Sequence, residues 1–96
     1  MVVIKRLIWD PWNIAHIAHH GVTPDAAEEV CHGDPVTSAT HHDRLRVVGP
    51  ADDGRMLTVI LDPELDEVGV YYPVSARPAS RKERRRYHDL KAGEHS

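Results

Sequence analysis

The segment SARPASRKERRRY, residues 75–87, has the clearest chemical potential in the sequence because it places six Lys or Arg side chains in ten positions, 77–86. Ser80 and Glu83 stand at the spacing of a capping box, in which each side chain bonds the other's backbone N–H, so a helix is predicted to begin here. The positive end of this helix is joined by three guanidinium groups, those of Arg77, Arg81 and Arg84. The pattern predicts a phosphate-binding site.

Charge is distributed unevenly along the chain, whose formal net charge is -3. Residues 1–70 contain 5 Lys or Arg against 12 Asp or Glu, whereas residues 71–96 contain 7 against 3. A basic C-terminal segment on an acidic protein indicates a docking surface for an anion, a nucleic acid or an acidic partner. The alternative is that the basic residues form the solvated face of a helix.

Histidine is the second candidate for chemistry, because six of the eight histidines fall within 27 residues. These are His16, His19, His20, His32, His41 and His42. His16 and His20 are four residues apart and could chelate zinc from one face of a helix, with His41, His42 or Asp43 as a third ligand. The alternative is that these side chains are solvated on polar helix faces and loops, since the chain has a single cysteine.

The elements that must position these residues begin with an apolar strand at residues 2–9, which ends at Asp10. Asp10 is predicted to cap a short amphipathic helix with Pro11 at its first position, and Gly21 to end it. Thr23 and Pro24 repeat the start signal for a second helix, which runs to about Cys31. We expect a loop at residues 33–43 because that segment is polar and lacks a period.

Three further strands follow in RLRVVG, RMLTVILD and VGVYYPVS, joined by a tight turn at residues 51–54 and a longer one at PELDE. Pro73 cannot donate to a ladder, so the last strand is predicted to be bulged or unpaired there. The expected fold is therefore α+β, in the order β-α-α-β-β-β-α, with an antiparallel sheet flanked by helices.

The length of 96 residues suits one domain spanning 1–96, with the last few residues expected to be flexible. Cys31 has no partner for an intrachain disulfide, and no apolar run is long enough to cross a bilayer. We therefore expect a cytoplasmic protein with no membrane contact.

Several of these segments resemble the BrnT family of bacterial type II toxins. The segments are WDPWNIAHIAHHGVTPDAAEEV, a following DP, RLRVVG, DGRMLTVIL and VSARPASRKERRRY, and together they cover nearly the whole chain. The most specific motifs are WDP at residues 9–11, HGV at 20–22 and SAR at 75–77, with Glu83, Arg84 and Tyr87 spaced behind the last. Three collinear motifs at the family's spacing carry this resemblance.

The resemblance implies a RelE-like α+β ribonuclease, a hydrolase that binds RNA and blocks translation. It also implies a BrnA-like antitoxin with a ribbon-helix-helix domain, through which the toxin reaches DNA indirectly when the complex represses its operon. A homodimer or heterotetramer is expected. The RNA's own 2′-hydroxyl attacks the phosphodiester, which requires proton carriers and cations but no metal or other cofactor.

The resemblance also implies roles for individual residues. Arg77 and Arg84 are expected to hold the phosphorane, because the arginine fork binds two phosphate oxygens at once. Glu83 could act as the general base or simply as the capping-box residue. His20 or Tyr87 could exchange protons.

A second set of residues is expected to bind RNA without taking part in the chemistry. This set comprises Arg81, Lys82, Arg44 and Trp9. Trp9 could stack on a base, although a tryptophan at the end of a first strand could equally belong to the core.

The sequence departs from the family's pattern where relatives place basic residues, because it has LDPELDE and YYPV there. Acidic or neutral residues at these positions weaken attraction to RNA. An alternative is therefore a catalytically degenerate interaction module, whose Arg-rich helix binds an acidic partner.

Overall fold

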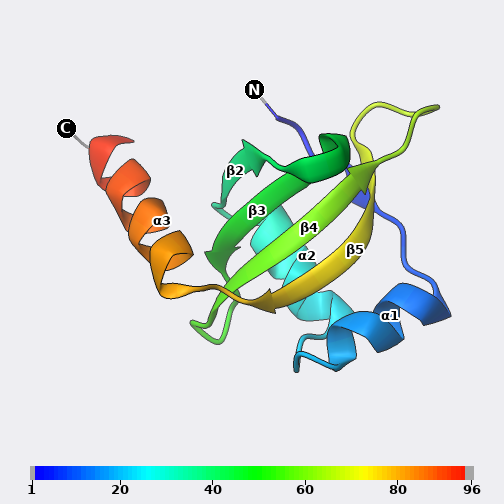
Figure 1. The fold of residues 1–96 in the computed structure, drawn as a ribbon, viewed down its shortest axis with the longest axis horizontal. Helices are drawn as coiled ribbons and strands as arrows, with labels where there is room; N and C mark the ends of the chain where they lie inside the picture. The colour runs from blue at the N-terminus through cyan, green and yellow to red at the C-terminus, as the bar shows by residue number, and fades with distance from the viewer. Residues whose placement is uncertain (1, 95–96) are drawn as a thin grey trace.

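The computed structural model describes residues 2–94 and contains one five-stranded mixed sheet in the order β1-β5-β4-β3-β2 (Figure 1). Its strands are β1 (Arg6–Leu7), β2 (Val36–Ala39), β3 (Leu45–Pro50), β4 (Met56–Pro63) and β5 (Val70–Pro78). The four strands from β2 to β5 pair antiparallel, and β1 pairs parallel to β5.

Three α-helices and one short 3-10 helix complete the fold, which confirms the expected α+β class. They are α1 (Pro11–Ala18), α2 (Pro24–His32), η1 (His41–Asp43) and α3 (Arg81–Glu94). As predicted, Asp10 and Thr23 cap α1 and α2, and a proline opens each helix. α2 lies behind the sheet and α1 lies beside β5, whereas α3 extends away from one end of the sheet (Figure 1).

The core lies between α1, α2 and one face of the sheet. Ile17 and Val30 of these helices are fully buried in one cluster with Leu57, Val59 and Ala76 of the central strands. Because side chains alternate along a strand, the residues between these positions point to the opposite face. That opposite face is not covered by α1 or α2 (Figure 1).

The sequence prediction was wrong at both edges of the sheet. Within the segment expected to be a loop, residues 36–39 form β2. It is a strand because its backbone pairs with β3, although its sequence VTSA shows no apolar alternation. At the other edge, only Arg6–Leu7 of the expected strand 2–9 enter the ladder, and they run parallel to β5. The sheet is therefore mixed rather than antiparallel, and the order gains one strand.

The predicted bulge at Pro73 is confirmed and is held by a buried amide. The register passes from Ile60 opposite Ser75 to Leu61 opposite Pro73, so β5 has one extra residue there. The Asn13 side chain is fully buried, and its Nδ2 donates to the carbonyl oxygens of Ile8 (2.9 Å) and Pro73 (3.1 Å). Asn13 thus joins the start of α1 to the bulge and to the chain after β1.

Three further expectations concern membrane spans, Cys31 and the C-terminus. No helix within residues 2–94 is long and apolar enough to cross a membrane. Cys31 is buried in α2, and burial raises the pKa of its thiol to about 12. The expected flexibility of the last few residues concerns positions 95–96, which lie outside the described residues.

Replacing Asn13 by Ala should lower the free energy of unfolding by about 2–4 kcal/mol, because it leaves buried carbonyl oxygens without a donor. Asn13 Oδ1 also accepts from the backbone N–H of Asp10, and that bond is lost as well. Urea denaturation checks this, with Ala15→Ser on the exposed face of α1 as control. Equal stability of the two variants would show that Asn13 does not stabilise the fold by joining α1 to the bulge.

Candidate functional site

The candidate site lies on the face of the sheet that α1 and α2 leave free, at the place where the start of α3 covers it and Thr58 is fully buried. The strand register places Thr58 of β4 between Val48 of β3 and Arg77 of β5. Tyr87 and Ala79 pack against Val48 and close one end of this face. The start of α3 is therefore fixed directly above Thr58 and Arg77.

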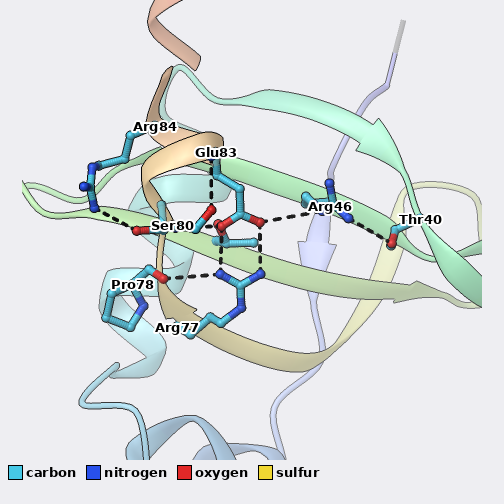
Figure 2. A network of polar contacts seen from close by, with 9 residues as sticks. Thr40, Arg46, Arg77, Pro78, Ser80, Glu83 and Arg84 are labelled. Atoms are coloured by element: carbon cyan, nitrogen blue, oxygen red, sulfur yellow. Dashed lines mark hydrogen bonds and ion pairs between the residues drawn. The ribbon is translucent and has the colours of Figure 1, made fainter. Parts of the chain in front are cut away.

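The Glu83 carboxylate is the centre of the site (Figure 2). Its Oε1 accepts hydrogen bonds from Arg77 Nη1 (2.7 Å), Ser80 N (2.8 Å) and Thr58 Oγ1 (2.9 Å), and its Oε2 accepts from Arg77 Nη2 (2.9 Å). Ser80 Oγ accepts from the Glu83 N–H at 3.1 Å, which confirms the predicted capping box. One carboxylate thus connects β4, β5 and α3.

These bonds determine the ionisation of the pair. The hydrogen bonds from Arg77, Ser80 and Thr58 outweigh partial burial and lower the pKa of Glu83 to about 2. The same hydrogen bond to Glu83 raises the pKa of Arg77. Glu83 is therefore a carboxylate at neutral pH and a weak proton acceptor.

One further cation approaches this carboxylate, and two others line the surface beside it. Arg46 of β3 reaches to 3.9 Å between its Nε and Glu83 Oε2, while its Nη2 donates to Thr40 Oγ1 at 3.3 Å. Arg46 Nε is buried without a hydrogen-bond partner in the described structure. An open depression beside it is lined by Arg46, Ser80, Lys82, Glu83 and Arg86. We call Arg46, Arg77, Lys82 and Arg86 the cation cluster.

The structure brings some of the expected catalytic and RNA-binding residues together and separates others. Arg77, Glu83 and Lys82 lie at the cation cluster. Arg84 does not, because its Nη1 donates to the carbonyl oxygen of Ala79 (2.9 Å) and its side chain points away from Arg77 (Figure 2). Arg81 is exposed in the first turn of α3.

The expected proton carriers do not face Arg77. Tyr87 is a buried residue of α3, and its hydroxyl donates to the carbonyl oxygen of Asp34 at 3.0 Å. His20 lies just after α1, which packs on the opposite, helix-covered face of the sheet. Its ring makes an edge contact with the ring of His16.

The two remaining RNA-binding candidates also lie away from Glu83. Trp9 packs against the core and donates from Nε1 to Glu28 Oε1 at 3.1 Å, so it is a core-side residue. Arg44 precedes β3, and its Nε lies 4.0 Å from Asp62 Oδ1. Like Arg46, it has a buried Nε without a partner among the described residues.

Sequence reasoning missed Arg46 and Arg86. The signal for Arg46 is the alternation in RLRVV, which puts Arg44 and Arg46 on the face opposite Leu45 and Val47. The signal for Arg86 is its spacing of three residues from Glu83, which places both on one side of the helix. Arg84 was expected beside Arg77 as a second phosphorane ligand, but Arg77 lies in β5 and Arg84 in α3, where its side chain donates to Ala79.

The histidine-rich segment does not converge. Within residues 2–94 no group of three or more His, Cys, Asp or Glu side chains is arranged to hold a metal ion. The rings of His16 and His20 are 6.3 Å apart between centroids and nearly perpendicular, and His16 instead stacks on Trp12. A zinc site built on this pair has no third ligand in the described structure.

Comparison with known proteins gives no family assignment. No protein-family model matches the chain. A search of curated proteins likewise gives no match.

Stability should depend on pH through Glu83. Its folded-state pKa of about 2 lies below the ordinary value of 4.5, so its stabilising effect is complete above pH 4.5 and is lost as pH falls towards 2. Glu83→Gln should unfold about 1–2 kcal/mol more easily at pH 7 and match the wild type near pH 2.

Chemical denaturation between pH 2 and 7 measures this difference. Glu64→Gln, in an exposed loop, is the control and should follow the wild type throughout. Parallel curves for the wild type and Glu83→Gln over the whole range would show that the carboxylate charge does not stabilise the fold.

Proposed function

We propose that the chain is the toxin of a bacterial type II toxin-antitoxin system, a metal-independent ribonuclease of the BrnT kind with a RelE-like fold. The observation that carries the proposal is the convergence of Arg46 and Arg77, from two different strands, on one anion at the face of the sheet that α1 and α2 leave free. A face with several converging cations suits a phosphodiester backbone. The motifs shared with BrnT toxins support the same activity.

In this proposal the RNA phosphate takes the place of the Glu83 carboxylate between the two guanidinium groups. The 2′-hydroxyl oxygen bonds to phosphorus and the bond to the 5′-oxygen breaks, which leaves a 2′,3′-cyclic phosphate and a 5′-hydroxyl. Negative charge grows on the phosphorane oxygens, and positioned guanidinium groups stabilise it. The arginine fork suits this role because it stays charged and can bind two oxygens at once.

Proton transfer contributes less in this mechanism than charge stabilisation. Glu83 has a pKa of about 2 and is a weak base, and the Tyr87 hydroxyl is engaged with Asp34. The proton lost by the 2′-hydroxyl and the proton gained by the 5′-oxygen are therefore exchanged with water. Electrostatic stabilisation of this kind often supplies the largest part of an enzyme's rate enhancement.

The proposal includes the partner and the compartment. A BrnA-like antitoxin with a ribbon-helix-helix domain neutralises the toxin by covering α3, and the complex reaches DNA through that domain. The cytoplasm is the compartment in which such a toxin meets translating RNA. Exposed basic residues on the outer side of α3 offer a surface for an acidic antitoxin segment.

A second candidate function is an interaction module that has lost catalysis. The observation in its favour is that the Arg77 fork is already occupied by Glu83 through two short hydrogen bonds. In this case the basic helix binds an acidic partner, and the Arg77–Glu83 pair serves stability alone.

Replacing Arg46 or Arg77 by Ala should lower the RNA cleavage rate about 10²- to 10³-fold, by analogy with the loss of one preorganised donor. Arg84→Ala removes the same charge from a side chain that points away, and it should lower the rate less than about tenfold. Cleavage of a labelled RNA by each purified variant measures this, with thermal unfolding to confirm that each is folded.

Equal losses in all three variants would indicate an undifferentiated charge patch instead of a positioned pair. If the wild type neither cleaves RNA nor arrests bacterial growth when expressed without its antitoxin, the ribonuclease proposal fails. The interaction module then becomes the better interpretation.

Cleavage should be unchanged by EDTA, because the proposed chemistry uses guanidinium groups and water. Activity is measured in EDTA and after dialysis into buffer containing zinc. Loss of activity in EDTA with recovery in zinc would instead assign a function to the histidine-rich segment. His16→Ala is the control variant, and its activity should equal that of the wild type.

A further inference from the structure

Two surfaces of opposite charge lie outside the ion pair of Arg77 and Glu83, and the first of them shares Lys82 and Arg86 with the cation cluster. The first is a groove on the outer side of α3, lined by Lys82, Arg85, Arg86, Asp89 and Leu90. None of its three basic side chains forms an ion pair with another residue of the described chain, and Leu90 is 43% exposed. We call this surface the α3 groove.

The second surface is the loop between β4 and β5, residues 64–69. Its Leu65 is 97% exposed and stands between Glu64 and Asp66. Neither of these two carboxylates has an ion-pair partner in the part of the chain that the structure describes. A leucine of this exposure beside two free carboxylates contributes little to the fold.

The loop and the groove are complementary in chemistry. Each presents one leucine with charges of a single predominant sign around it, negative on the loop and positive on the groove. They lie at opposite ends of the molecule, α3 at one end and the β4–β5 loop at the other, so they cannot meet within one chain (Figure 1). Any contact between them would therefore join two molecules.

We propose that the acidic loop of one copy of this chain docks in the α3 groove of a second copy. Leu65 contacts Leu90 of the second copy, and Glu64 and Asp66 face its Arg85 and Arg86. A nucleic acid fits this surface less well, because a phosphate backbone offers no apolar group to contact the exposed leucine beside the arginines. The contact is heterologous, since it pairs two different surfaces.

This self-association does not depend on the proposed ribonuclease activity. It does cover Lys82 and Arg86, which belong to the cation cluster, so a docked copy also restricts access to that site. The inference is tested by association alone, without any RNA, and its failure is therefore distinguishable from failure of the ribonuclease proposal.

Sedimentation velocity of the full chain over a range of concentrations tests the contact. Self-association is expected at low salt and should weaken about tenfold or more in 1 M NaCl, where the screening length falls to about 3 Å. Leu65→Ser should weaken it about tenfold at either salt, because the apolar contact is lost. A wild type that stays monomeric at low salt and high concentration would overturn the proposal.

Charge reversal gives the sharper result. The loop variant Glu64→Lys/Asp66→Lys and the groove variant Arg85→Glu/Arg86→Glu should each be monomeric alone, yet associate when mixed because each reversed surface then meets its complement. The control Asp25→Lys/Asp52→Lys has the same net charge as the loop variant and reverses two exposed residues elsewhere. It should associate like the wild type. Failure of the mixture to associate, or equal weakening in the control, contradicts docking of the loop in the groove.

Discussion

The ion pair between Arg77 and Glu83 is the constraint on which the rest of the site depends. β5 ends at Pro78 and α3 begins at Arg81, so the direction of the helix is set within a few residues. Just after that short connection, the Glu83 carboxylate accepts hydrogen bonds from Arg77 of β5, from the Ser80 N–H and from Thr58 of β4. Because three elements meet at one group, the helix cannot turn without breaking several charge-assisted hydrogen bonds.

A projecting helix needs such an anchor because its apolar contact with the sheet is small. Tyr87 and Ala79 pack against Val48, and most other side chains of α3 are exposed. The opposite face of the sheet is different, since α1 and α2 bury the main core there. One face of the sheet therefore supplies stability, while the other is free to carry charged groups, which is the arrangement a binding surface requires.

The sequence predicted the local chemistry of this fold better than its long-range pairing. The capping box of Ser80 and Glu83 depends on residues three apart and was predicted, and the bulge at Pro73 was predicted from the missing N–H of the proline. β2 was missed because pairing with β3, and not its own polar residues, makes it a strand. Arg46 was missed for the same reason: its distance from Glu83 is set by the register across the sheet, which one sequence does not contain.

The position of Glu83 among the cations also has a consequence for binding. Arg46 and Arg77 carry like charges on neighbouring parts of the sheet, and without an anion between them their repulsion would oppose folding. An internal carboxylate removes that repulsion when no ligand is present. In the proposed function an RNA phosphate would have to displace this bonded carboxylate, so the net gain on binding would be the difference between two ion pairs and not the strength of one. Glu83 thus stabilises the folded protein when the two guanidinium groups hold no other anion.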